Sequence, residues 1–266
     1  MRIKISHHTI NISDQGPQDG PALVFAHSLG SDLSQWDALC AKLPDSLRLV
    51  RYDARGHGAS GAPDTPYSMG QLIKDAEHVL DHLNVRDCVF LGAGMGGLIA
   101  QGLAVKRLDQ IRALVLCGSA AKLGTPQTWA RQIEMAQAQG MAQIAYNAMP
   151  LTFPRKTQDS THARHWQSQC AQMDVQGYVG CCAAISGTDF YTPTAALRLP
   201  CLGLCGIDDR VTPPDLMRET VGLIAGSRFQ LIRRAGHLPM LDAPTACAIH
   251  LNAFLGELGL PHLQPA

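Results

Sequence analysis

Short runs of consecutive apolar residues recur along the chain, and longer amphipathic stretches separate them. A run without polar interruption is typical of a strand that is buried on both faces, as in a parallel sheet. Six such strands are predicted, at residues 22–26, 48–53, 87–91, 112–117, 200–205 and 228–232. Residues 3–12 are interpreted as an antiparallel hairpin at the start of the sheet.

Between these strands, apolar residues return every three or four positions, which is the period of a helix with one buried face. The clearest case is residues 69–83, where Ser68 and Gln71 have the spacing of a capping box. Further helices are predicted at residues 96–106, 213–223 and 243–258. Alternating strands and helices predict an α/β fold with an open, mostly parallel, doubly wound sheet.

The alternation is interrupted between residues 121 and 197, where no buried strand is predicted. This segment instead carries helical patterns, at residues 125–139, 141–149, 159–173 and 176–186. We therefore expect a helical lid at residues 121–197. It would be inserted between two parts of one α/β core, residues 1–120 and 198–266.

Composition narrows the class of protein. The 266 residues carry 22 Lys and Arg against 22 Asp and Glu, so no excess of positive charge favours nucleic acid or an anionic membrane. No apolar run reaches the roughly 20 residues that a membrane span needs, and the first residues lack the apolar region of a signal peptide. The nine cysteines lack zinc-like spacing and are interpreted as free buried thiols of a cytoplasmic protein. Oligomeric state stays open.

A glycine-rich turn at residues 91–97 carries the most informative motif. It follows a predicted strand and precedes a predicted helix. Glycines two positions before and two positions after its central residue are typical of a nucleophile elbow, whose central residue is normally serine. Here that residue is Gly94. A dinucleotide-binding turn is the competing interpretation, and it is disfavoured because no acidic residue ends a strand about 20 residues later.

An acidic pair and a histidine follow the glycine-rich turn in the chain order that nucleophilic catalysis on such a sheet requires. Asp208 and Asp209 come directly after the strand at 200–205, and His237 comes after the strand at 228–232. Open α/β sheets bind ligands on loops at the carboxyl ends of their strands. The loop after the first buried strand can offer a backbone N–H to an oxyanion. These elements predict a hydrolytic site.

Together these segments resemble the α/β-hydrolase superfamily and, within it, the 3-oxoadipate enol-lactonases most closely. The resemblance covers nearly the whole chain and is weakest in the helical segment. It is carried by residues 27–32, 51–60, 91–97 and 235–237.

The resemblance implies roles for particular residues. Asp209 takes the position of the acid, with Asp208 as the alternative, and His237 takes the position of the base. The backbone N–H groups of Leu29 and Met95 take the positions of the oxyanion donors. The implied reaction is hydrolysis of a small lactone or carboxylic ester through an acyl-enzyme, and it needs no metal or organic cofactor.

Gly94 departs from the family pattern, because it stands where the nucleophile belongs. Three hypotheses account for it. The first is an engineered replacement that inactivates a serine hydrolase. The second is a natural protein in which His237 and Asp209 activate a water molecule. The third is a pseudoenzyme that binds a small molecule without turnover.

Two further polar residues, Ser28 and His57, lie in segments that carry the resemblance. Ser28 lies in the oxyanion loop, but no elbow aims its hydroxyl, which disfavours it as a displaced nucleophile. His57 lies in an Arg-Gly-His-Gly sequence that is interpreted as a structural turn.

The helical segment is expected to cover the substrate pocket. Candidate apolar walls are Trp129, Met135, Tyr146, Met149, Phe153 and Trp166. The carboxylate of an enol-lactone needs a cationic partner. Candidates for that partner are Lys122, Arg131, Arg155, Lys156 and Arg164. The pocket prediction therefore comprises Ser28, Trp129, Arg131, Tyr146 and Trp166.

Overall fold

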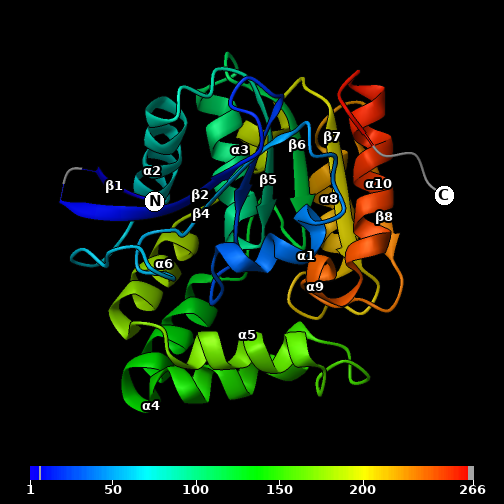
Figure 1. Cartoon of the computed structure of the whole chain (residues 1–266). Coiled ribbons are helices and arrows are strands. Elements are labelled where there is room, and N and C mark those ends of the chain that lie inside the picture. Colours follow the sequence, from blue (N-terminus) through cyan, green and yellow to red (C-terminus); the bar gives the residue numbers. More distant parts are fainter. Residues whose placement is uncertain (6, 263–266) are drawn as a thin grey trace.

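The computed structural model describes residues 1–5 and 7–262 and shows an eight-stranded sheet flanked by helices (Figure 1). The strands are β1 (Arg2–Ile5), β2 (His8–Gln15), β3 (Ala22–Ala26), β4 (Arg48–Tyr52), β5 (Cys88–Ala93), β6 (Ile111–Cys117), β7 (Cys201–Gly206) and β8 (Arg228–Ile232). Their order across the sheet is β1-β2-β4-β3-β5-β6-β7-β8. The first two pairs, β1 with β2 and β2 with β4, are antiparallel, and the other neighbours are parallel. The predicted hairpin and the mostly parallel α/β sheet are confirmed.

The helices that pack on the sheet within the described core are α1 (Asp37–Cys40), α2 (Met69–His82), α3 (Met95–Lys106), α8 (Pro214–Gly222), α9 (Pro239–Asp242) and α10 (Pro244–Glu257), with a 3₁₀ turn at Leu33–Trp36. Of these, α2, α3, α8 and α10 lie close to their predicted positions. The capping box at the start of α2 is confirmed, because the side chains of Ser68 and Gln71 each accept a backbone N–H from the other residue. The short helices α1 and α9 were not predicted.

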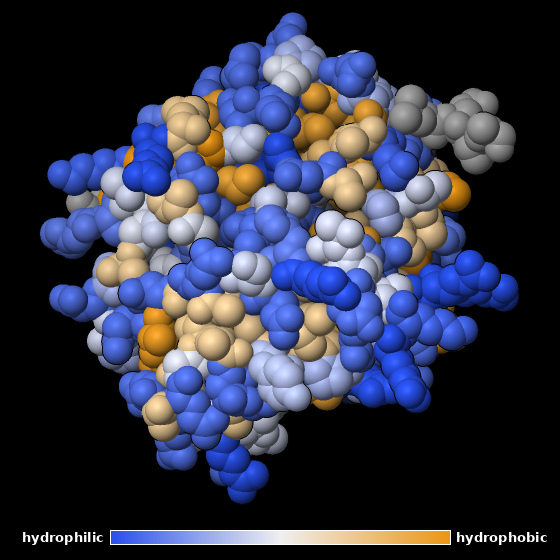
Figure 2. All heavy atoms as spheres, turned by 60° about the horizontal axis from the view of Figure 1, so that its bottom comes forward, coloured by the Kyte–Doolittle hydropathy of each residue, from blue (hydrophilic) through white to orange (hydrophobic). Residues whose placement is uncertain are grey.

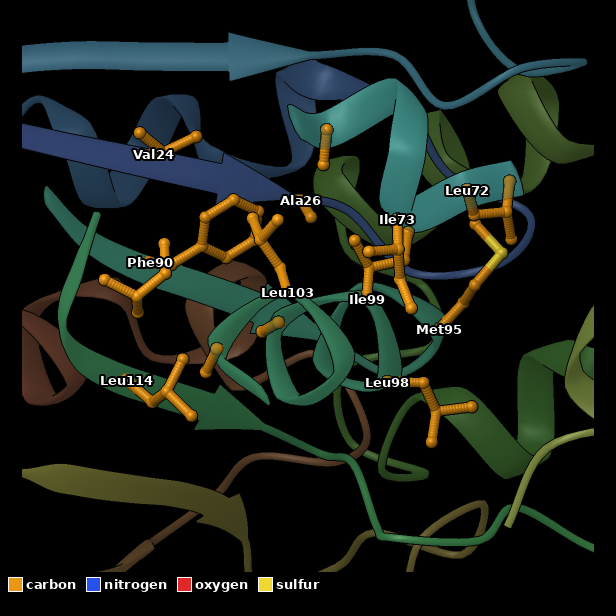
Figure 3. Packing of buried hydrophobic residues seen from close by; sticks show 14 of the residues in the cluster. Val24, Ala26, Leu72, Ile73, Phe90, Met95, Leu98, Ile99, Leu103 and Leu114 are labelled. Carbon is orange, nitrogen blue, oxygen red and sulfur yellow. The ribbon is translucent and has the colours of Figure 1, made fainter. Parts of the chain in front are cut away.

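Burial on both faces of the sheet explains the uninterrupted apolar runs. In β3, Val24 and Ala26 belong to a cluster with α2, α3 and α8, whereas Leu23 and Phe25 belong to a second cluster with α1, α9 and α10. Successive side chains of a strand point to opposite faces, so both faces must be apolar. Figure 3 shows the first cluster, with side chains of β3, β5 and β6 packed against α3.

Four helices occupy the segment between β6 and β7, all of whose residues are described. They are α4 (Pro126–Thr152), α5 (Thr161–Ala171), α6 (Val175–Ser186) and α7 (Tyr191–Ala195). The two helices predicted at 125–139 and 141–149 are two helical segments of α4, and Gly140 separates them with a non-helical φ of 77° and ψ of 173°. Figure 1 shows α4 and α5 stacked below one end of the sheet. The short α7 was not predicted.

The cysteines are confirmed as free thiols, and all nine are buried. Burial raises the pKa of the Cys40 thiol to about 12, and it also raises that of Cys170 to about 12. No helix in the described part of the chain is both long and apolar enough to cross a membrane.

Candidate active site

The turn between β5 and α3 has the backbone geometry of a nucleophile elbow. Gly94 alone separates Ala93, the last residue of β5, from Met95, the first residue of α3, and its φ is 49° with ψ of −113°. A side chain at this position would be strained, because L-residues rarely adopt such dihedrals. Ser119 Oγ donates a hydrogen bond of 2.7 Å to the Gly94 carbonyl and fixes the turn. A Cβ on Gly96 would overlap the Ala26 carbonyl, so α3 packs against β3 only with glycine there.

His237 and Asp209 form a hydrogen-bonded pair beside this turn. His237 Nδ1 lies 3.1 and 3.2 Å from the two carboxylate oxygens of Asp209. Asp209 is buried, and its Oδ1 accepts the backbone N–H groups of Val211 and Thr212 at 2.8 Å each, which fixes the carboxylate. Asp208, the alternative acid, is exposed to solvent. Because a carboxylate only accepts, the contact requires a proton on Nδ1, and in the neutral form of the ring Nε2 then presents a lone pair.

The free nitrogen of this imidazole faces the elbow. A Cβ built on Gly94 would lie 3.3 Å from His237 Nε2 and 3.2 Å from Ser28 Cβ. Within the described chain, Nε2 has no hydrogen-bond partner. A hydroxyl at position 94 would therefore stand within reach of a general base, which is the relation between nucleophile and base in acyl transfer.

Two backbone N–H groups are available at the same place. Met95 is the first residue of α3, so its N–H has no acceptor in its own helix. Leu29 lies in the loop after β3, and its N–H donates to no protein group among residues 1–5 and 7–262. Both residues line the cavity next to Gly94. Paired donors of this kind stabilise a tetrahedral oxyanion.

Two buried histidines hold the loop that carries Leu29. His27 Nε2 accepts the Ala54 N–H at 2.9 Å, and His57 Nε2 accepts the Gly30 N–H at 3.3 Å. Burial, together with the nearby His27, lowers the pKa of His57 to about 3, so His57 is neutral at ordinary pH. These contacts support the interpretation of the turn around His57 as structural.

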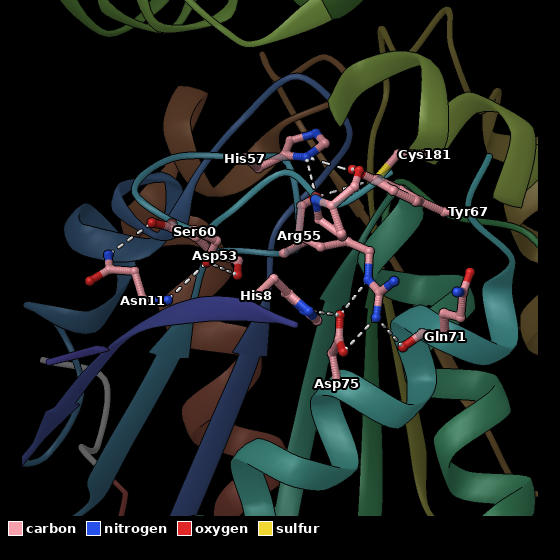
Figure 4. A network of polar contacts seen from close by, with 12 residues as sticks. His8, Asn11, Asp53, Arg55, His57, Ser60, Tyr67, Gln71, Asp75 and Cys181 are labelled. Carbon is pink, nitrogen blue, oxygen red and sulfur yellow. Dashed lines mark hydrogen bonds and ion pairs between the residues drawn. The ribbon is translucent and has the colours of Figure 1, made fainter. Parts of the chain in front are cut away.

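Figure 4 shows how that turn is tied to the core. Arg55 makes a bidentate contact with Asp75 of α2, with N–O distances of 2.6 and 2.7 Å, and His8 lies 3.4 Å from the same carboxylate. Burial by itself would raise the pKa of Asp75, but hydrogen bonds from His8 and Arg55 and the charge of Arg55 hold it below its usual value. Asp53 binds the Leu33 N–H at 2.8 Å. Hydrogen bonds and ion pairs therefore tie the turn around His57, and through it the loop that carries Leu29, to the core.

A cavity of about 320 Å³ opens between the elbow and the helical segment. Its floor is formed by the loop after β3, the elbow and His237, and its walls come from α4, α5, α6 and the loop after β7. Ser28, Trp129 and Trp166 line it, as the sequence predicted. Most of the lining is apolar, and Gln132 donates a hydrogen bond of 2.8 Å to the Tyr178 hydroxyl on one wall.

Several predicted pocket residues lie elsewhere, and those predictions were wrong. Tyr146 is 69% exposed, and Arg131 is also exposed, because both lie on the solvent side of α4. The remaining predicted walls and cations do not line the cavity either: Met135, Met149, Phe153, Lys122, Arg155, Lys156 and Arg164. Lys122 and Arg164 form ion pairs with Asp189 and Asp159 instead.

Among the described residues, the cation that lines the cavity is Arg210, which was not predicted from the sequence. It follows Asp209 directly in the chain, and among the described residues its side chain has no ion-pair partner. Leu151 and Val211 also line the cavity while being 48% and 45% exposed, so they mark its mouth. Figure 2 turns the helical end of the molecule forward, where apolar residues gather amid a mostly hydrophilic surface. The only feature of the sequence that could have indicated Arg210 is that it directly follows Asp209, the candidate acid.

Comparison with known proteins agrees with this geometry. Residues 23–249 match the alpha/beta hydrolase family. The chain is 35% identical to 3-oxoadipate enol-lactonase 2 of Acinetobacter baylyi over 239 residues, which is 89% of each chain. It is 30% identical to 3-oxoadipate enol-lactonase 1 of the same organism, again over 89% of each chain. The crystal structure of the enol-lactonase from Burkholderia xenovorans superposes with a TM-score of 0.93 at 29% identity, covering 96% of this chain and 100% of that one. The chain belongs to the alpha/beta hydrolase family.

Proposed function

We propose that the cavity is a hydrolytic site for a small lactone or carboxylic ester, with Gly94 at the nucleophile position of a Ser-Asp-His triad. One observation carries the proposal. His237 Nε2, with its Nδ1 held by Asp209, lies 3.3 Å from the point where a side chain on Gly94 would begin. The N–H groups of Leu29 and Met95 supply the oxyanion donors.

Two observations favour a lactone such as 3-oxoadipate enol-lactone over other substrates. The most similar relatives named above are 3-oxoadipate enol-lactonases, at 35% and 30% identity over most of both chains. The cavity is mostly apolar and carries Arg210 at its mouth, where a guanidinium can pair with a substrate carboxylate.

The proposed mechanism for the Gly94→Ser form is acyl transfer. The serine hydroxyl attacks the lactone carbonyl while His237 Nε2 takes its proton, and Asp209 stabilises the imidazolium. The N–H groups of Leu29 and Met95 bind the oxyanion. When the intermediate collapses, the ring C–O bond breaks and His237 gives its proton to the leaving oxygen. Water then hydrolyses the acyl-enzyme by the same steps.

Residues 121–197 would act as the lid of this site. The side chains of Trp129 and Trp166 contribute two large apolar surfaces to the cavity wall. Exclusion of water by such walls strengthens the hydrogen bonds to the oxyanion. The β-strand core on either side, residues 1–120 and 198–266, would carry all of the catalytic groups.

The test compares the chain as given with Gly94→Ser on 3-oxoadipate enol-lactone and on p-nitrophenyl acetate. Loss of a triad serine costs on the order of a millionfold in kcat, so restoring one should raise turnover by several orders of magnitude. The double variant Gly94→Ser with His237→Asn is the control and should lose the gain. A Gly94→Ser chain that folds and hydrolyses neither substrate would refute the proposal.

A further inference from the structure

We propose that the chain with Gly94 in place hydrolyses its substrate directly, with a water molecule at the elbow as the nucleophile and His237 as the general base. The inference rests on the proposed function for the substrate class. The inferred reaction differs from the proposed acyl transfer, because no acyl-enzyme forms.

The position of the water follows from the geometry around Gly94. A Cβ on Gly94 would lie 3.3 Å from His237 Nε2, so the space that a side chain would fill lies beside this nitrogen. A water that rests against the Gly94 Cα from the cavity side can enter that space and donate to Nε2. This nitrogen lines the cavity and has no protein partner within the described residues. Its lone pair is therefore free to accept a proton from that water.

The surroundings can hold one water there. Gly94 provides the room, because the methylene and hydroxyl of a serine would fill about the space of one water, which is about 30 Å³ in the liquid. Ser28 closes the other side, with its Cβ 3.2 Å from where a Cβ on Gly94 would lie. The Ser28 hydroxyl donates to Gln35 Oε1 at 2.8 Å, so its own oxygen keeps lone pairs that can accept from a water.

The same hydrogen bond argues against Ser28 as a displaced nucleophile. Its proton is directed to Gln35 rather than to His237, and the carbonyl oxygen of an amide is no general base. Within the described chain, Ser28 and His237 make no hydrogen bond to one another. Activation of a hydroxyl needs such a contact with the base.

The reaction balances without a co-reactant. The water oxygen forms a bond to the carbonyl carbon while His237 Nε2 takes one water proton, and the negative charge develops on the carbonyl oxygen between the N–H groups of Leu29 and Met95. The intermediate then collapses, the C–O bond to the leaving oxygen breaks, and that oxygen takes the proton from His237. A lactone gives one ring-opened acid, and an ester gives an acid and an alcohol.

Three forms of the full-length chain test this proposal on 3-oxoadipate enol-lactone and p-nitrophenyl acetate: the chain as given, Gly94→Ala and His237→Asn. The methyl group of alanine would lie between Ser28 Cβ and His237 Nε2 and leave less room for the water, without supplying a nucleophile. We expect the chain as given to hydrolyse a substrate, and each variant to be slower by about 10²–10⁴-fold, the usual contribution of a general base. The loss of rate in His237→Asn is the decisive result. Substrate binding and oxyanion donors alone leave about 10³–10⁴-fold acceleration over water when a triad is dismantled, so hydrolysis by itself would not show that His237 acts as a base.

Several outcomes would overturn the direct reaction. Hydrolysis that persists unchanged in Gly94→Ala or in His237→Asn would do so, and so would a covalent acyl group on Ser28 detected by peptide mass spectrometry. An inert chain beside an active Gly94→Ser form would overturn it while leaving the proposed function intact. If Gly94→Ala fails to fold, the rate of His237→Asn still tests whether the direct reaction occurs. Inactivity of the Gly94→Ser form on both substrates would instead count against the proposed function itself.

Discussion

His237 and Gly94 face each other across the floor of the cavity, with Nε2 of the imidazole 3.3 Å from the point where a Cβ on the glycine would lie. The proposed base, its acid partner and the proposed oxyanion donors are thus arranged around a residue that has no side chain. In the proposed function, one substitution at position 94 decides whether the site can form a covalent intermediate.

We expect Gly94→Ser to leave the melting temperature unchanged or to lower it. Gly94 has φ of 49° and ψ of −113°, a conformation that costs about 1–3 kcal/mol for a residue with a side chain. The new Cβ would also lie 3.2 Å from Ser28 Cβ, which is a tight contact. Calorimetry of both forms checks this, and a clearly higher melting temperature for the serine form would show that the elbow is unstrained.

Arg210→Ala should discriminate between charged and neutral substrates in the Gly94→Ser background. A charge-assisted hydrogen bond contributes about 1.5–3 kcal/mol, and the exposure of Arg210 to solvent reduces that contribution. We expect kcat/KM for the carboxylate-bearing lactone to fall about 10-fold, mainly through KM, with little change for p-nitrophenyl acetate. Arg131→Ala is the matched control, since Arg131 is exposed outside the cavity. An equal fall in kcat/KM for both substrates would contradict the proposal that Arg210 pairs with the substrate carboxylate.

The free energy of unfolding should decrease as the pH is lowered, because of His57. Its folded pKa of about 3 lies below the ordinary value of 6.5, so the unfolded chain takes up a proton first as the pH drops. The stabilising contribution is complete above pH 6.5 and is lost toward pH 3, about 2 kcal/mol of it between pH 6.5 and 5. Urea unfolding of His57→Gln should show a smaller decline over that range. His82→Gln, at an exposed position, should decline like the parent, and identical slopes in all three would contradict the assignment.

The buried thiols should resist alkylation in the native state. Burial raises the pKa of Cys170 to about 12, and that of Cys201 also to about 12, so very little reactive thiolate exists at pH 8. Iodoacetamide should modify the folded chain slowly and all nine cysteines quickly in urea. Intact mass spectrometry counts the adducts over time. Rapid labelling of several cysteines without denaturant would show that the core opens readily.

The sheet was predictable from the sequence because its central strands are buried on both faces. Runs such as residues 22–26 need no knowledge of their partners to be interpreted as buried strands. The helical segment was harder to predict, because amphipathic patterns do not show how helices join. The break between the helices predicted at 125–139 and 141–149 is confirmed at Gly140, but the pattern did not show that α4 continues directly beyond it, and α7 is only five residues long.

The candidate catalytic groups could be proposed from the sequence because backbone motifs position them. The glycines of the elbow and the strand ends before Asp209 and His237 are local features of the chain. The pocket walls depend on how α4 turns relative to the core. That orientation places Trp129 at the cavity and leaves Arg131 and Tyr146 in solvent, and no local pattern gave it.

The central claim is that position 94 is a nucleophile position served by His237 and the oxyanion donors. Intact-protein and peptide mass spectrometry of the Gly94→Ser chain, mixed rapidly with p-nitrophenyl acetate, tests it most directly. The account predicts one acetyl group per chain, on the peptide that contains position 94, which forms and then decays. It also predicts no such adduct in the parent or after His237→Asn. Absence of the adduct in a folded Gly94→Ser chain, or its appearance on another residue, would contradict the account.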